Sequence, residues 1–130
     1  MTSGPIIDHQ ILIGLWHLQR GHCAYCGGAM PHPDRPSKTE GRSNPTKDHL
    51  LPLARGGRDE VENRVAACDG CNQDKGPLDA ATFVRVRLNP VMLKEARRRC
   101  DAEVRAAHQA AKPGSHARAT AVPPTPSRSD

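Results

Sequence analysis

Residues 68–76, CDGCNQDKG, decide the fold that this sequence is expected to adopt. Cys68 and Cys71 form a C-x2-C pair here, and Cys23 and Cys26 form a second pair upstream. Two such turns each present two thiolates to one side, which suits tetrahedral coordination of zinc by four sulfur atoms. The pattern therefore predicts one structural Zn2+ site made by all four cysteines, with no open coordination position for catalysis.

Two other interpretations of the cysteines stay open. The four thiols could be unlinked and reduced, or His22 beside Cys23 could replace one sulfur ligand. A fifth cysteine, Cys100, has no partner at a ligand spacing and is expected to be a small buried side chain. The start of the sequence, MTSGPIIDHQ, has no basic region before an apolar stretch, so no secretory signal is expected. A cytoplasmic, reducing location follows, where paired cysteines more often bind metal than form disulfides.

The composition predicts one small domain with a thin core. The chain has 130 residues, of which 36% are hydrophobic and only 2% aromatic. A core of this kind often needs a bound metal or disulfides for stability. The net charge of +5 favours a polyanionic partner without identifying one. No apolar run approaches the roughly 20 residues that a membrane-spanning helix needs, so no membrane partner is expected.

A helix is predicted within residues 5–22, because one set of apolar residues recurs every three or four positions. That set is Ile7, Ile11, Leu15 and Leu18. Gly21 is expected to end this helix. Residues 29–45, with four prolines, are expected to form an exposed loop. Residues 113–130 also carry four prolines and little apolar bulk, and they are expected to be a disordered tail.

Two short strands are expected at residues 46–49 and 64–67. The Gly56-Gly57 pair lies in the loop between them and is expected to make the return turn. Residues 68–76 then enter a short helix. The cysteine pair of this segment therefore lies where the second strand is expected to lead into a helix.

Two more helices are expected downstream. Asp79 is a suitable N-cap for a helix in residues 77–88, and Asn89-Pro90 supplies a cap and a first-turn proline for a long helix over residues 89–112. An apolar stripe runs along this long helix: Leu93, Ala96, Cys100, Val104, Ala107 and Ala111. The stripe would either pack on the core or pair with a second chain, so a homodimer through this helix stays open.

Four polar residues beside these strands and cysteines form a candidate second site: Asp48, His49, Asn63 and Asn72. Singly, each has an ordinary role as a turn acid, a surface imidazole, a turn amide or a helix cap. Zinc at Cys71 would fix the neighbouring Asn72. The amide oxygen of Asn72 and the carboxylate of Asp48 are hard ligands suited to Mg2+ or Mn2+. An unperturbed imidazole has a pKa of about 6.5, which suits a general base. Adjacent side chains of a regular strand point apart, so Asp48 and His49 serve one site only where the strand bends at its end.

Together, CAYCGG…TKDHLLPLARGGRDEVENRVAACDGCNQDKG resembles an HNH endonuclease domain of the zinc-stapled type, from about residue 23 to residue 76 and more loosely to residue 88. The resemblance is carried by D-H, the Gly-Gly loop, an asparagine fourteen residues after the histidine, and C-x2-C-N-x2-K-G. Asn72 stands where many members have histidine, and the family includes such H-N-N variants. The resemblance implies an α+β fold with a small ββα-metal (His-Me finger) core in residues 23–88 and flanking helices.

The resemblance also implies roles for individual residues. Asp48 and Asn72 would bind one catalytic Mg2+ or Mn2+ against the scissile phosphate. His49 would take a proton from the attacking water, and Asn63 would orient the loop that follows it. Residues 50–53 are expected to act as anchors that keep His49 pointed at the metal. Members of the family hydrolyse DNA phosphodiester bonds, so the expected function is a metal-dependent DNA endonuclease.

Duplex DNA is the expected partner, because few aromatic residues are present to stack on the bases of a single strand. Arg55 and Lys75 lie near the expected site and are predicted to contact phosphate groups. Residues 85–105 carry seven basic side chains against three acidic ones, which fits either phosphate contacts or a solvated helix face with i,i+4 ion pairs. The alternative functions are a catalytically inactive zinc-stapled nucleic-acid-binding module and a zinc domain that binds other proteins.

Overall fold

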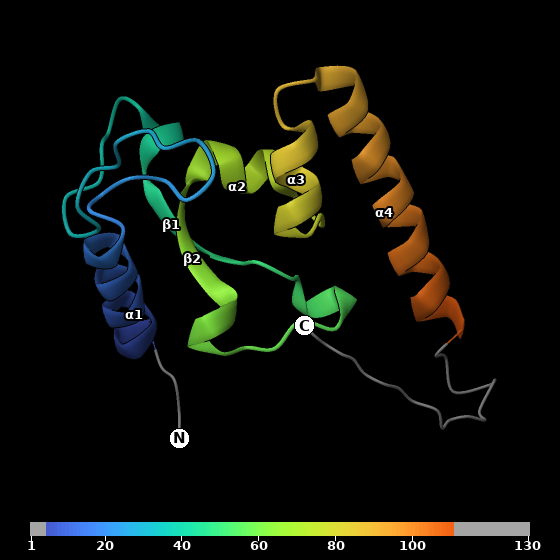
Figure 1. Ribbon diagram of the computed structural model, residues 1–130. Helices are drawn as coiled ribbons and strands as arrows, with labels where there is room; N and C mark the ends of the chain where they lie inside the picture. The colour runs from blue at the N-terminus through green and yellow to red at the C-terminus, as the bar shows by residue number, and fades with distance from the viewer. Residues whose placement is uncertain (1–4, 111–130) are drawn as a thin grey trace.

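The computed structural model describes residues 5–110, with side chains from residue 8 onward (Figure 1). Its helices and strands are α1 Pro5–Leu18, β1 Pro45–His49, β2 Arg64–Cys68, α2 Asp69–Lys75, α3 Ala80–Val86 and α4 Pro90–Ala110. Short 3-10 turns lie at Gly41–Ser43, Leu53–Arg55 and Val61–Asn63. This α+β fold contains a ββα unit, made by β1, β2 and α2, and confirms the expected fold class. The tail predicted at residues 113–130 lies outside the described residues.

The two strands form an antiparallel hairpin in which Asp48 lies opposite Val65. α1 contacts both strands, and α2, which follows β2 without an intervening loop, contacts them as well. In Figure 1, α1 lies to one side of the hairpin, while α2 leads to α3 and α4 on the other side. The strands expected at residues 46–49 and 64–67 are confirmed, each being one residue longer than predicted.

The N-caps predicted for α3 and α4 are confirmed. The Asp79 carboxylate accepts hydrogen bonds from the Thr82 backbone N–H at 3.1 Å and from the Thr82 hydroxyl at 2.8 Å. The side-chain oxygen of Asn89 accepts from the Met92 N–H at 3.1 Å. These bonds satisfy amide groups that have no partner within the helix itself, so both helices begin where the caps lie.

The core is small and combines apolar side chains with cysteines. Its buried members are Leu15, Cys23, Met30, Ala66, Ala67, Cys71, Leu78, Phe83, Val86 and Cys100. Cys100 on α4 is 2% exposed, as expected for a buried thiol. Alanine and cysteine occupy half of these positions, so the core has few large side chains to hold it together. No helix among residues 5–110 combines the length and the apolar character needed to cross a membrane.

Two expectations near the end of α1 are corrected by the structure. Leu18 is 80% exposed, because α1 ends at this residue and the chain turns away through Arg20, whose φ is +57°. Met30 is buried in what was expected to be an exposed loop. Its N–H donates to the Gly21 carbonyl at 2.7 Å, and its carbonyl accepts from the Trp16 indole at 3.1 Å. The start of the loop is thereby fixed to the end of α1.

Phe83 and Val84 provide a test of how much of the stability depends on the small core. Phe83 is 1% exposed and Val84 is 55% exposed on the same helix. Phe83→Ala is expected to lower the free energy of unfolding by about 3–5 kcal/mol, whereas Val84→Ala should change it by less than about 0.5 kcal/mol. Urea unfolding of the metal-loaded protein measures both values. Equal effects of the two substitutions would contradict the described core.

Candidate functional site

The two cysteine pairs converge at the point where β2 leads into α2. The Sγ atoms of Cys23, Cys26, Cys68 and Cys71 all lie within 4.8 Å of one another, and those of Cys26 and Cys68 are 3.9 Å apart. A tetrahedral zinc ion with Zn–S bonds of about 2.3 Å holds its sulfur atoms about 3.8 Å apart. These four residues, called the sulfur cluster below, therefore fit a metal such as zinc. His22 bonds to a backbone carbonyl instead and is not among the clustered groups.

Backbone amides contribute to the electrostatics of the sulfur cluster. The Tyr25 N–H donates to Cys23 Sγ at 3.3 Å, and the Cys71 N–H donates to Cys68 Sγ at 3.4 Å. Burial raises the pKa of Cys23, but hydrogen bonds from the surrounding backbone outweigh it and lower that pKa to about 7. Burial raises the pKa of Cys68 and of Cys71. A metal ion that binds these thiols therefore displaces protons, and acidification weakens its binding.

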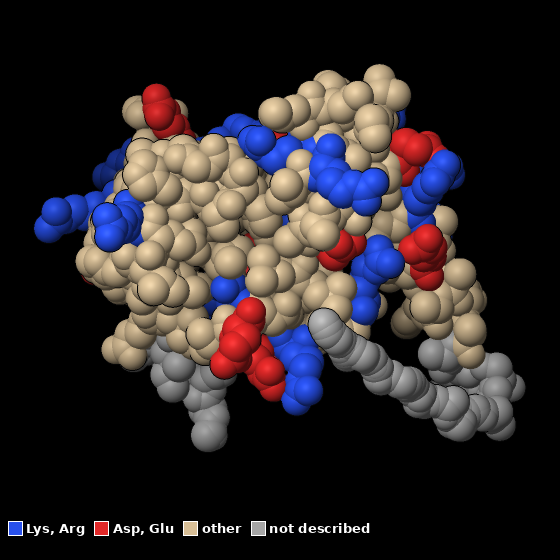
Figure 2. Space-filling model, viewed as in Figure 1, with Lys and Arg blue, Asp and Glu red and all other residues tan. Residues whose placement is uncertain are grey.

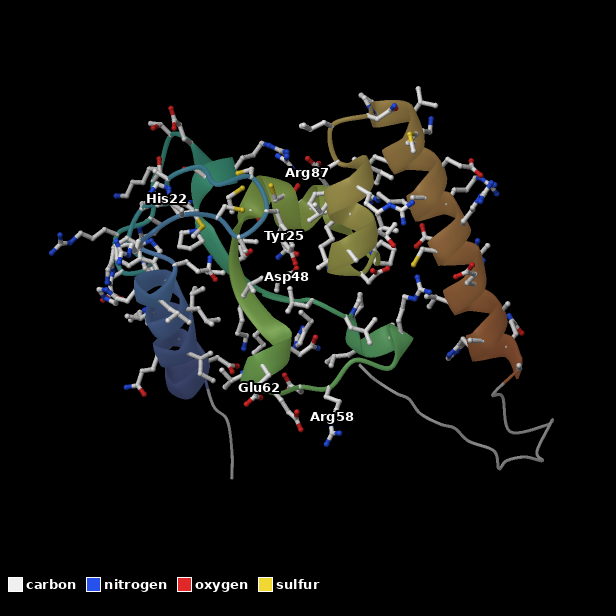
Figure 3. All side chains as sticks on the ribbon, viewed as in Figure 1. His22, Tyr25, Asp48, Arg58, Glu62 and Arg87 are labelled. Atoms are coloured by element: carbon white, nitrogen blue, oxygen red, sulfur yellow. The ribbon has the colours of Figure 1, made fainter. Side chains whose placement is uncertain are left out.

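Asp48 is a buried carboxylate at the end of β1, and two donors contact the same oxygen of it. The Tyr25 hydroxyl donates to Asp48 Oδ2 at 2.5 Å, and Lys75 Nζ lies 3.3 Å from that oxygen. Figure 3 shows Tyr25 and Asp48 pointing toward one another, next to the sulfur atoms at the start of α2. Burial, followed by the hydrogen bond to Asp48, raises the pKa of Tyr25, so the phenol stays protonated and donates.

Lys75 occupies a different environment from the one expected. Its side chain is 1% exposed, and its ammonium group donates to the His49 carbonyl at 3.0 Å in addition to its ion pair with Asp48. We expected this side chain to reach a DNA phosphate from the surface. Because a buried ammonium is stable only when it is paired, the structure instead uses Lys75 to balance the charge of Asp48.

Asn72 lies on the same side of the hairpin as Asp48. Its side-chain amide donates to Thr46 Oγ1 at 3.0 Å, and Thr46 and Asp48 are alternate residues of β1, so they share one face of the strand. Among the described residues, neither Asp48 Oδ1 nor Asn72 Oδ1 makes a hydrogen bond. The two residues thus retain oxygen atoms of the kind that Mg2+ and Mn2+ prefer.

His49 has a carboxylate partner that the sequence did not indicate. His49 Nε2 lies 3.0 Å from Asp59 Oδ1, and Arg64 donates to the same oxygen from Nε at 3.1 Å. The hydrogen bond to His49, followed by those from Arg64, lowers the pKa of Asp59 to about 2. The Asp59 carboxylate is therefore ionised. Asp59 follows the Gly-Gly turn in RGGRDE, a composition that is typical of an ordinary exposed loop. No hydrogen bond among the described residues joins His49 to the side chain of Asp48 or Asn72.

Asn63 holds the loop that follows His49. Its side-chain oxygen accepts from the Leu51 N–H at 2.9 Å, and its amide nitrogen donates to the carbonyls of Leu51 at 2.9 Å and Arg58 at 2.8 Å. Residues 50–53 were expected to act as anchors that keep His49 pointed at the metal, but Leu51 and Leu53 are 39% and 50% exposed, and Leu50 and Pro52 are only half-buried. Backbone hydrogen bonds to Asn63 therefore fix this loop, together with the partial burial of Leu50 and Pro52.

Gly57 allows the same loop to close tightly. A side chain at Gly57 would place its Cβ 1.8 Å from the carbonyl oxygen of Leu51, a distance that no real contact adopts. Gly56, which precedes it, has a φ of +92°. The Gly-Gly pair therefore makes the close turn that the sequence predicted, and glycine is required at Gly57 by space and at Gly56 by backbone conformation.

Arg55 bonds to α4, and no hydrogen bond or ion pair among the described residues joins it to Asp48 or Asn72. Its guanidinium lies 2.8 Å from Cys100 Sγ and 3.3 Å from Glu103 Oε1. A phosphate contact by Arg55 would have to replace these bonds, so its predicted DNA contact receives no support from this geometry. Acidic and basic atoms alternate along α4 in Figure 2, which fits the interpretation of that helix as a solvated, ion-paired face.

Comparison with known proteins identifies the class to which this arrangement belongs. Residues 36–84 match the family model described as HNH endonuclease. The matched segment contains β1, β2, α2 and most of α3, and it includes all four candidate polar residues. This part of the chain therefore matches the HNH endonuclease family, as the resemblance of its motifs implied.

A curated relative points to the same family. The chain is 35% identical over 80 residues to the CRISPR-associated endonuclease Cas9 of Corynebacterium diphtheriae. The match covers 60% of this chain but spans only 6% of the length of that relative. The similarity therefore concerns a small part of a much longer protein.

The sulfur cluster predicts metal binding that depends on four cysteines and not on the fifth. The zinc-supplemented protein is expected to carry about one metal equivalent per chain. Cys71→Ser should lose that metal and lower the melting temperature by more than about 10 °C, because binding of a structural metal contributes directly to folding. Elemental analysis and thermal unfolding measure the two effects. Cys100→Ser is the matched control, and loss of the metal in this variant as well would contradict the assignment.

Proposed function

We propose that this chain is a metal-dependent DNA endonuclease, with a structural zinc in the sulfur cluster and a single divalent cation at Asp48 and Asn72. The observation that carries the proposal is the position of Asp48 and Asn72 on one side of the hairpin, within a segment of the HNH family. His49, the neighbour of Asp48, supplies the base. Hydrolysis of a phosphodiester bond requires both functions, a cation to neutralise charge on the phosphate and a base to activate water.

In the proposed mechanism, Asp48 and Asn72 would hold Mg2+ or Mn2+ through their side-chain oxygens. When bound, the cation supplies electrostatic stabilisation of the phosphate and of the leaving 3′-oxygen. His49 Nδ1 accepts the proton of the attacking water, because Nε2 is engaged by Asp59. The ionised Asp59 carboxylate fixes the imidazole ring and favours the proton on Nε2, which leaves Nδ1 as the basic atom. Asn63 keeps the following loop in place.

The proposed substrate is a DNA duplex, consistent with the net charge of +5. One active site cuts one strand, so cleavage of both strands requires a second encounter or a dimer. We propose residues 23–88 as the nuclease domain and residues 89–112 as a C-terminal helix. Leu93, Ala96 and Val104 of its apolar stripe pack against the core that contains Cys100, so a second chain would have to pair through another face of this helix. Residues 111 and 112 of that helix lie outside the described part of the chain.

A catalytically inactive nucleic-acid-binding module is the second candidate, and one observation favours it. The ammonium of Lys75 lies 3.3 Å from Asp48 and already balances its charge. In an inactive module this ion pair would replace the catalytic cation permanently. The two candidates differ in whether the zinc-loaded protein cleaves DNA when Mg2+ or Mn2+ is added.

His49→Ala is expected to abolish nicking of supercoiled plasmid in Mn2+ or Mg2+, with a loss of roughly 10²- to 10⁴-fold, because the base that activates water is removed. Conversion of supercoiled to open-circular DNA on a gel measures the rate. His108→Ala removes an exposed histidine on α4 and serves as the matched control. An equal nicking rate in wild type and His49→Ala, or no nicking by the wild type, would rule out the proposed mechanism.

Asp59→Asn tests whether the carboxylate acts through His49. The substitution should remove part of the contribution of the base and so lower the nicking rate to a value between those of wild type and His49→Ala. Added to His49→Ala, it should lower the rate no further, because its effect requires the imidazole. Glu60→Gln, which removes the neighbouring acid that pairs with Arg58, is the control. Additive losses in the double variant would show that Asp59 acts elsewhere.

A further inference from the structure

We propose that Tyr25 is a positioning residue for the divalent-cation site, and that through it the sulfur cluster sets the geometry of Asp48. The inference deepens the proposed function and rests on it, since it concerns the same cation site. Tyr25 lies outside the segment that matches the HNH family model, which begins at residue 36. The role proposed for Tyr25 therefore rests on the contacts that it makes in this structure and not on the family match.

Tyr25 is built into the turn that carries two cysteines of the sulfur cluster. It lies between Cys23 and Cys26, and its own N–H donates to Cys23 Sγ at 3.3 Å. Its ring is half-buried and meets Phe83 of α3 edge-on, with the ring centroids 5.3 Å apart. The position of the phenol is thus set on one side by the cysteine turn and on the other by α3.

The phenol reaches from this turn to the candidate cation ligand. Its hydroxyl donates to Asp48 Oδ2 at 2.5 Å, the same oxygen that Lys75 approaches to 3.3 Å. Both donors use one oxygen, so Asp48 Oδ1 remains the atom that a cation would bind. Two fixed donors on Oδ2 hinder rotation of the carboxylate, which presents Oδ1 in one direction.

Loss of the phenol hydroxyl should weaken cation binding without opening the fold. Hydrogen-bonding partners of a metal ligand orient it, and their removal typically lowers metal affinity or activity by 10- to 100-fold. Tyr25→Phe keeps the ring against Phe83 and keeps the backbone N–H on Cys23. Lys75 would remain as the sole donor to Asp48 Oδ2 among the described residues, held by its second bond to the His49 carbonyl.

The test is direct Mn2+ binding to the zinc-loaded full chain without DNA, measured by electron paramagnetic resonance of the unbound ion. Tyr25→Phe is expected to raise the Mn2+ dissociation constant by about 10- to 100-fold while retaining one zinc per chain. In nicking assays the Mn2+ concentration for half-maximal rate should rise by a similar factor, and the maximal rate should recover at high Mn2+. The matched control is Trp16→Phe, which removes the indole N–H that donates to the Met30 carbonyl.

The possible outcomes distinguish failure of the role proposed for Tyr25 from failure of the proposed function. Unchanged Mn2+ affinity in Tyr25→Phe, with affinity lost in Asp48→Asn, would overturn the role of Tyr25 and leave the proposed function standing. Loss of zinc from Tyr25→Phe would also overturn it, because the hydroxyl would then serve the sulfur cluster. If the wild-type protein binds no Mn2+, or if Asp48→Asn binds Mn2+ as tightly as the wild type does, both the cation site and the role of Tyr25 are overturned.

Discussion

The convergence of four cysteine sulfurs is the constraint on which the rest of this structure depends. The pairs are separated by 41 residues of sequence, and that intervening chain contributes few large side chains to the buried core. Closing so long a segment costs conformational entropy that a thin core offsets poorly. A metal bound by the sulfur cluster supplies folding free energy at the junction of β2 and α2. It thereby fixes α2, which carries Asn72 and Lys75 to the strand that ends in Asp48 and His49.

Charge balance at Asp48 is the second constraint. A buried carboxylate without a partner costs several kcal/mol, and Lys75 and Tyr25 together avoid that cost. A divalent cation bound beside this neutral ion pair would leave a local charge of about +2. In the proposed function, a phosphate group of the substrate would offset that charge and strengthen the binding of the cation. The same electrostatics would make a lysine beside a metal ligand compatible with the proposed catalysis.

Much of the fold and part of the site could be predicted from the sequence. Local geometry could be predicted from three features: the spacing within each cysteine pair, the helix caps at Asp79 and Asn89, and the Gly-Gly turn. The structure agrees with each of these predictions. The partners of the polar side chains could not be predicted in the same way. Asp59, Tyr25 and the buried position of Lys75 depend on side-chain directions set by tertiary packing, and their residue types are ordinary for a loop, a turn and a helix end.

The errors have the same physical origin. Leu18 fitted the helical spacing of apolar residues and was grouped with the buried face. The spacing does not predict where the helix ends and the chain turns away from the core. The exposed Leu51 shows that the loop after His49 is held by the hydrogen bonds of Asn63. Where backbone hydrogen bonds and not apolar burial fix a segment, hydrophobic pattern is a poor guide to its position.

The most direct test of the central claim is anomalous diffraction from crystals of the zinc-loaded protein soaked in Mn2+. Two separate metal peaks are expected. A zinc peak should lie within the sulfur cluster, and a manganese peak should lie within coordination distance of a carboxylate oxygen of Asp48 and of the amide oxygen of Asn72. A manganese peak elsewhere, or none with Lys75 still paired to Asp48, would contradict the proposed catalytic site.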